Sequence, residues 1–386
     1  MPKIVLFKLS ELAASVASGI QITESELTSK AVVAALALAG KSVQSVGGMC
    51  CDKSGNIYVS DTEQSIILKI NESGKINTIA GVAGSAGNNS ALQNVAAATA
   101  RFNQPKGLAC DNTGNIYVAD YGNNQIRKID GQGRVSVLAG NGATTSGLVD
   151  STSDPLQSRF SHPSDVAVDA SGNVYVADTD NNAIRKIYRG QVLTIAGGTG
   201  TTDAWNVRAS KYIPFCSAPT TIDVNQRGDL FIGDSGHYRI KKITPNGWVY
   251  NFSGSGVSGH SIGTAGVTAA TAQAYTCTYT AVQYLRVDRY GYVYAIDRDT
   301  STGYSRLVKI TPNGVPSIAV DFHTATTNYA GIAGVAVSPA GKVFVSISLA
   351  SEAVSSSSSS SVDSSSSSSS SSSVDSSSSS SSSPGA

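Results

Sequence analysis

The sequence predicts an all-β fold, a six-bladed β-propeller, and two observations support it. The first is a repeat, because two alternating strands flank a shared glycine six times along the chain. The glycines are Gly55, Gly114, Gly172, Gly228, Gly291 and Gly341. The second is composition: 38 glycines and only 14% charged residues are typical of short strands joined by many tight turns. Four antiparallel strands repeated at a near-constant period are the pattern of a propeller blade.

The first five repeats are each predicted to form four strands in order. The clearest first and second strands are CDNTGNIYVAD (110–120) and VDASGNVYVAD (168–178), and third strands such as QIRKI (125–129) follow. A fourth strand comes next, for example RVSVLAG (134–140). The longest connections join a fourth strand to the next first strand, so we expect them to gather on one face and to bind there. They span 81–104, 141–162, 198–219 and 254–280.

The chain divides into three predicted regions. Residues 1–45 form an extension with a strand over 3–9 and a helix over about 23–39, residues 46–349 form the propeller, and residues 350–386 form a polyserine tail. The N-terminal residues lack the long apolar stretch of a secretion signal. The sixth repeat lacks its third and fourth strands, and Lys3–Leu9 resembles a missing third strand. This strand either closes the sixth blade in the same chain or inserts into a neighbour, and the sequence leaves both open.

Charge and hydropathy exclude two classes of partner. The chain has 28 Lys and Arg against 27 Asp and Glu, a net charge of +1. Nucleic-acid binding of the ordinary kind is excluded, because few counterions would be released from phosphates. No run of 18 apolar residues exists, so no membrane span is predicted.

Two segments carry a family resemblance. RFNQPKGLACDNTGNIYVADYGNNQIRKI (101–129) and RFSHPSDVAVDASGNVYVADTDNNAIRKI (159–187) resemble NHL repeats, which build six-bladed β-propellers. The resemblance covers about residues 46–348. NHL-type lyases imply a zinc ion held by three histidines, and propeller lactonases imply calcium beside a carboxylate. The four histidines here, His162, His237, His260 and His323, form no closely spaced pair, so no metal, cofactor or catalytic residue is predicted.

The recurring polar residues read as parts of the blades. One aspartate ends the second strand of five blades, and these are Asp61, Asp120, Asp178, Asp234 and Asp297. We expect each to accept hydrogen bonds from turn amides or from a cation of the third strand, such as Arg127, Arg185 or Lys241. The pairs Asn123–Asn124 and Asn181–Asn182 suit left-handed turn positions.

Cysteines and four tyrosines stand apart from this pattern. Cys51 and Cys110 occupy positions where other repeats have valine, which predicts core residues, and Cys50 is similar. Cys216 and Cys277 either pair or stay free. The tyrosines outside the repeated strands are candidate stacking surfaces for a sugar, and they are Tyr275, Tyr279, Tyr284 and Tyr329.

The tail and the fold together suggest a function. The serine runs around Ser355, Ser364 and Ser376 cannot form a core, so they are disordered unless a partner or O-linked glycan holds them. We expect a non-enzymatic structural or binding propeller, a homo-oligomer or filament subunit that assembles through the N-terminal strand and the tail. We expect the protein to be extracellular or part of a virion appendage, and to bind a glycan or a protein through the long loops. The alternative is a secreted NHL-type lyase or lactonase with a channel metal.

Overall fold

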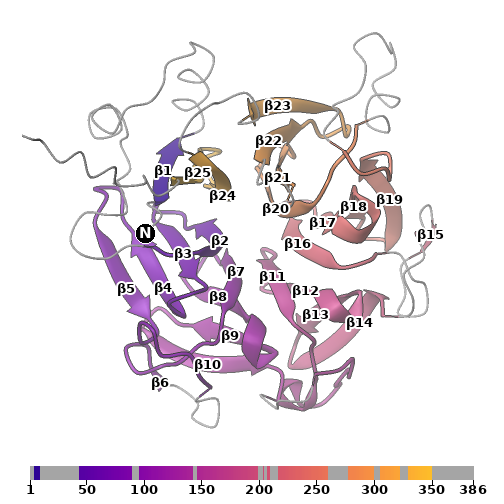
Figure 1. Cartoon of the computed structure of the whole chain (residues 1–386). Coiled ribbons are helices and arrows are strands. Elements are labelled where there is room, and N and C mark those ends of the chain that lie inside the picture. Colours follow the sequence, from indigo (N-terminus) through magenta and orange to yellow (C-terminus); the bar gives the residue numbers. More distant parts are fainter. Residues whose placement is uncertain are drawn as a thin grey trace, which may run out of the picture. The chain divides into compact units, whose positions relative to one another are not determined.

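The described residues fold into six antiparallel sheets, each formed by strands that follow one another in sequence except at the chain ends (Figure 1). The computed structural model describes residues 4–8, 43–88, 95–141, 146–198, 203, 207–208, 216–259, 277–299, 305–321 and 329–349. They lie within the first of two compact units of the chain, Met1–Ser351. None of the helices in these ranges is long and apolar enough to cross a membrane.

Five of the sheets contain the four expected strands. Blade 1 consists of β2 (Val46–Cys51), β3 (Ile57–Asp61), β4 (Ile66–Ile70) and β5 (Ile76–Ala80). Blade 2 consists of β7 (Pro105–Cys110), β8 (Ile116–Asp120), β9 (Gln125–Ile129) and β10 (Arg134–Ala139), with β6 (Val95–Ala96) added at its edge. Blade 3 consists of β11 (Pro163–Val168), β12 (Val174–Asp178), β13 (Ala183–Tyr188) and β14 (Gln191–Gly197). Blade 4 consists of β16 (Pro219–Val224), β17 (Leu230–Asp234), β18 (Arg239–Ile243) and β19 (Trp248–Ser253), with β15 (Val207–Arg208) at its edge. Blade 5 consists of β20 (Val282–Val287), β21 (Val293–Arg298), β22 (Ser305–Ile310) and β23 (Pro316–Asp321).

The first strands of successive blades contact one another in a closed circuit. β2 contacts β7, β7 contacts β11, and the contacts continue through β16 and β20 to β24, which returns to β2. A circuit of this kind is the inner wall of a propeller around a central channel. The chain is therefore an all-β propeller with five complete blades and a three-stranded sixth sheet.

The sixth sheet is built from both ends of the propeller sequence. It contains β24 (Tyr329–Val337), β25 (Val343–Leu349) and β1 (Ile4–Lys8). β1 runs antiparallel to β25, with Ile4 opposite Ser348 and Lys8 opposite Phe344. The strand predicted over 3–9 thus closes the sixth blade within the same chain. The predicted helix over 23–39 and the polyserine tail lie outside the described residues.

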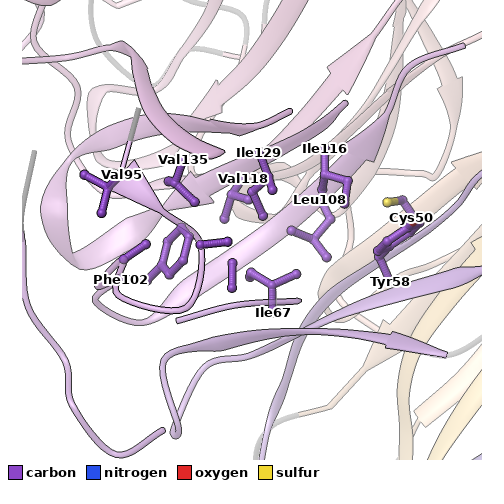
Figure 2. Close-up of a cluster of buried hydrophobic side chains, with 13 residues drawn as sticks. Cys50, Tyr58, Ile67, Val95, Phe102, Leu108, Ile116, Val118, Ile129 and Val135 are labelled. Carbon is purple, nitrogen blue, oxygen red and sulfur yellow. The ribbon is translucent and has the colours of Figure 1, made fainter. Parts of the chain in front are cut away.

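The core lies between the blades, because each blade packs against a neighbouring blade on both of its faces. Figure 2 shows the cluster between blades 1 and 2, where Tyr58 and Ile67 of blade 1 meet Leu108 and Val118 of blade 2. Ile67 and Val118 are fully buried there. These contacts fix the spacing of the first strands and so the geometry of the channel.

Short 3₁₀ helices mark the turns after the second strands. They are Tyr121–Asn123, Thr179–Asn181 and Ser235–His237, and a fourth, Pro155–Gln157, precedes blade 3. Asn124 and Asn182 end two of these turns with φ of 53° and 49°. Asparagine tolerates this left-handed conformation, which explains the Asn-Asn pairs in the sequence.

Candidate functional site in the central channel

Three blades depart from the repeat on one face of their first strands. At the third and fifth residues of these strands, blades 1, 2 and 6 have only glycine, alanine or Cys50. Blades 3, 4 and 5 instead carry larger polar side chains, namely Asp165, Thr221, Asp223, Tyr284 and Arg286. Because the other blades need only small residues there, these side chains have a role beyond forming a blade.

Arg286 connects strands from opposite sides of the channel. Its Nε donates to the carbonyl of Met49 in β2 at 3.1 Å, and Nη2 donates to the carbonyl of Leu108 in β7 at 3.2 Å. Nη1 donates to the Leu285 carbonyl at 2.7 Å and to Asp165 Oδ2 at 2.9 Å. Nη2 also reaches Asp165 Oδ1 at 3.3 Å. All five N–H groups of the guanidinium thus have a protein acceptor.

Asp165 extends this network to blade 4. Its Oδ2 accepts hydrogen bonds from Thr221 Oγ1 at 2.7 Å and from the Ile222 amide at 3.1 Å. Thr221 Oγ1 in turn accepts from the Leu285 amide at 3.0 Å. A Cβ on Gly107 would lie 1.9 Å from Asp165 Oδ1, so the glycine in blade 2 makes room for this carboxylate. Arg286, Asp165 and Thr221 together form what we call the channel network.

Tyr284 and Asp223 flank the channel network. The Tyr284 hydroxyl donates to the Val46 carbonyl at 3.0 Å, and burial raises the pKa of this phenol to about 12. Asp223 accepts from the Val287 amide at 2.8 Å and from the Val224 amide at 2.9 Å. Burial raises the pKa of Asp223 to about 6, although Arg286 favours its ionised form.

A cavity of about 410 Å³ lies beside this network and is lined by residues from the first strands and first turns of all six blades. Asp223 and Arg286 line it, together with the turn carboxylates Asp111, Asp169 and Asp288. The long connections predicted to bind ligand join the opposite ends of the first strands. The cavity therefore opens on the other face of the propeller from those loops.

A disulfide bond joins Cys50 in β2 to Cys110 in β7 beside this cavity. The prediction that Cys50 and Cys110 lie in the core is confirmed, because Cys50 belongs to the cluster between blades 1 and 2 and Cys110 packs against it. The close approach of neighbouring first strands also joins the two sulfurs, a pairing that the sequence left open. Cys51, Cys216 and Cys277 are buried and keep their thiols, so Cys216 and Cys277 do not form a disulfide bond with each other. Burial raises the pKa of Cys51 to about 12, which makes it a poor nucleophile.

The aspartates that end the second strands are fully buried in the blades. Asp120 accepts from the Asn103 amide at 2.8 Å, and Asp178 accepts from the Ser161 amide at 2.7 Å. Arg127 and Arg185 pair with them at 3.2 and 2.8 Å. Asp61, Asp234 and Asp297 accept the equivalent amides of Gln44, Ser217 and Thr280. Each aspartate thus ties the start of a first strand to the end of the second strand in its own blade.

One group of potential metal ligands occurs among the described residues. Asp203, Asp234 and His237 place one ligand atom each within 4.8 Å of one another. Lys241 pairs with both carboxylates, and Arg239 pairs with Asp203 at 2.7 Å. These cations neutralise the carboxylates and compete with a metal ion. His162 contacts Asp180 on the surface, and His260 and His323 lie outside the described residues.

The four candidate tyrosines do not converge. Tyr279 is fully buried, with its hydroxyl 2.9 Å from Ser253 Oγ, so its ring has no exposed face for a sugar. Tyr284 lies beside the channel, as described above. Tyr275 and the side chain of Tyr329 fall outside the described residues, as do Ser355, Ser364 and Ser376.

Comparison with known proteins places this geometry in a family. Residues 87–262 match the profile of the teneurin NHL domain. This chain is an NHL-repeat β-propeller. Human teneurin-1 is 30% identical over 172 residues, which are 41% of this chain and 6% of that protein.

Enzymes also occur among the similar proteins. A probable peptidyl-alpha-hydroxyglycine alpha-amidating lyase from Caenorhabditis elegans is 35% identical over 82 residues, 20% of each chain. A gluconolactonase structure from Xanthomonas campestris superposes with a TM-score of 0.50 at 11% identity, covering 79% of this chain and 87% of that chain. The chain thus spans a small part of these curated relatives, and the superposition shows the fold alone.

Sequence reasoning missed the channel network. Asp165, Asp223 and Arg286 each lie inside a repeat copy that otherwise matches the repeat, so no short motif marks them. A comparison of the six first strands position by position gives the signal, since it shows charged residues where most other copies have glycine, alanine or another uncharged residue.

Proposed function

We propose that this chain is a non-enzymatic binding and assembly propeller whose channel is held by a guanidinium group. The observation that carries the proposal is the set of five hydrogen bonds from Arg286. Asp165 is the buried carboxylate that a channel metal would need, and Arg286 already neutralises it. A divalent ion beside a buried guanidinium would be repelled.

Two further observations support an extracellular or virion setting and a repeating assembly. Disulfides such as Cys50–Cys110 persist in oxidising environments and are rare in the cytosol. In the part of the chain that the structure describes, β1 pairs on one side only, with β25. A strand from another copy would pair with the second edge of β1 and add a fourth strand to the sixth blade through backbone hydrogen bonds. Residues 350–386 would add contacts along neighbouring copies.

The ligand of such a module would be a glycan or a protein surface. The alternative function is a lyase or lactonase that uses a metal ion in the channel. The carboxylates that line the 410 Å³ cavity are potential metal ligands and support this alternative.

Metal content separates the two functions. The purified full chain is analysed by mass spectrometry for bound zinc and calcium, and is assayed with a hydroxyglycine peptide and with gluconolactone. We expect less than about a tenth of a metal ion per chain and no turnover above the buffer rate. One metal per chain that supports turnover of either substrate would overturn the proposal.

A further inference from the structure

A tyrosine–aspartate pair closes the outer side of the first turn in most blades. The Tyr58, Tyr117 and Tyr175 hydroxyls donate to Asp52, Asp111 and Asp169 at 3.0 to 3.1 Å. Tyr294 and Asp288 are the equivalent pair in blade 5. In blades 4 and 6 the tyrosine is replaced by Phe231 and Phe344, and the aspartate by Asn225 and Ser338.

Each of these two departures coincides with a cleft between blades. A cavity of about 260 Å³ is lined by Phe231 and Lys242 of blade 4 and by Arg289, Tyr290 and Pro312 of blade 5. A second cavity, of about 360 Å³, is lined by Phe344 of blade 6 and by residues of blade 1. We call them the 4/5 cleft and the 6/1 cleft. Both clefts therefore lie where the tyrosine–aspartate pair of the other blades is absent.

Only the 4/5 cleft is bordered by exposed aromatic rings among the described residues. Tyr290 is 62% exposed at its wall. On β19, Trp248 and Tyr250 are 44% and 41% exposed, and Tyr250 lies opposite Lys242 in the ladder. Cross-strand partners share a face of the sheet, and so do residues two apart on a strand. The two rings therefore continue the face that carries Lys242 and Phe231.

These aromatics are not required by the blade. At the position of Trp248 the other complete blades have Lys75, Arg134, Gln191 and Val315, and at that of Tyr250 they have Asn77, Ser136, Leu193 and Ser317. Leaving a large ring in water forgoes about 1.5–3 kcal/mol of burial free energy. Exposed aromatic rings beside a polar cleft are suited to stacking on the apolar face of a sugar.

The charge of the 4/5 cleft selects an anion. Its lining includes three cationic side chains, Arg227, Lys242 and Arg289, and one carboxylate, Asp229, so its net charge is +2. Asp229 pairs with Lys242 at 3.0 Å, whereas Arg227 and Arg289 are exposed. Arg289 also packs on the Tyr290 ring, 4.7 Å from its centroid. Both guanidinium groups can form paired hydrogen bonds to a carboxylate or sulfate.

We infer that the 4/5 cleft binds an acidic oligosaccharide, with its anionic groups on Arg227 and Arg289 and its rings against Tyr290, Tyr250 and Trp248. The inference rests on the proposed binding function and names its ligand class. It places the ligand on the face opposite the long loops. An acidic peptide would satisfy the same cations but would gain less from three exposed rings.

The test is calorimetric titration of the full chain with three probes: an oligogalacturonate, a neutral cello-oligosaccharide of the same length, and a polyglutamate peptide. We expect the oligogalacturonate to bind at least about tenfold more tightly than either of the others. Its affinity should fall with added salt. Equal or tighter binding of polyglutamate, or no binding of the oligogalacturonate, would overturn the inference.

A matched pair of variants locates the site. Asn225→Asp with Asp229→Asn and Phe231→Tyr rebuilds the repeat pair in blade 4, places a hydroxyl group and a relocated carboxylate in the cleft, and keeps its net charge unchanged. We expect it to fold as the parent does, judged by its unfolding midpoint, and to lose at least about tenfold in affinity. The control, Ser338→Asp with Phe344→Tyr, rebuilds the pair at the 6/1 cleft and should bind as the parent does. Unchanged binding by the first variant, or an equal loss in both, would overturn the inference. Neither result depends on metal content or turnover, so the proposed function stands or fails separately.

Discussion

Replacing Arg286 by methionine is the most informative perturbation of the fold. The change removes five hydrogen bonds and leaves the Asp165 carboxylate, only 2% exposed, without its cation. Removing one partner of a buried ion pair costs about 3–5 kcal/mol. Methionine retains much of the volume of the arginine side chain. The decrease in the free energy of unfolding therefore reflects the lost charge and hydrogen bonds more than the creation of a cavity. We therefore expect Arg286→Met to reduce the free energy of unfolding by about 3–5 kcal/mol.

The assay is urea unfolding followed by circular dichroism and fluorescence, for Arg286→Met, Asp165→Asn and the double variant. Because both groups belong to one network, the double variant should cost about 1–3 kcal/mol less than the sum of the single variants. The control is Arg289→Met, an exposed arginine three residues along, which should change stability by less than about 0.5 kcal/mol. A cost below about 1 kcal/mol for Arg286→Met, or strictly additive single costs, would refute the view that Arg286 holds the channel together.

Three further predictions follow from the same region. Cys50→Ala introduces the alanine that other blades carry and should lower the free energy of unfolding by about 2–4 kcal/mol. Reductant should lower the stability of the parent by a similar amount and leave that of the variant unchanged. Equal sensitivity of both proteins to reductant would argue against the disulfide. Asp223 has a folded pKa of about 6, above its unfolded value near 3.9, so the folded state binds its proton more tightly and its contribution to stability is lost as pH rises from about 4 to 6. In urea unfolding, the stability of Asp223→Asn relative to the parent should therefore be higher at pH 7 than at pH 4. A difference in stability that does not change with pH would contradict the raised pKa of Asp223. Deleting residues 1–9 removes β1, whose second edge is proposed to join copies, so light scattering should detect smaller assemblies than in the parent; assemblies of unchanged size would argue against a role for this edge.

The blade architecture was predictable because the same sequence pattern occurs six times in the chain. Alternating strands, the shared glycines and the strand-ending aspartates recur, so each copy supports the interpretation of the others. The closing strand was also predictable in position, since Lys3–Leu9 matches the third-strand pattern. The sequence did not show whether this strand pairs with the sixth blade of its own chain or with that of a neighbouring copy. The edge of the sixth blade offers the same backbone hydrogen bonds in both cases.

The site was harder to predict because it depends on differences between copies. Arg286 lies 121 residues from Asp165 and more than 230 from Met49, and only the circular arrangement of first strands brings them together. The same holds for the disulfide, which links equivalent strands of adjacent blades across 60 residues. Phe231 differs from the equivalent tyrosines of blades 1, 2, 3 and 5 by one hydroxyl group, and the sequence alone does not show that this position lines a cleft.

Hydrogen exchange of the Arg286 guanidinium protons tests the central claim most directly. In protein labelled with ¹⁵N-arginine, the Nε–H signal of Arg286 is assigned by its loss in Arg286→Met. Arg286 is buried, and its guanidinium group donates hydrogen bonds through all five N–H groups, so its protons should exchange far more slowly than those of the exposed Arg289. Added zinc or calcium should leave its signal unchanged. Exchange as fast as that of Arg289, or displacement of the signal by one equivalent of metal, would contradict a channel held by Arg286.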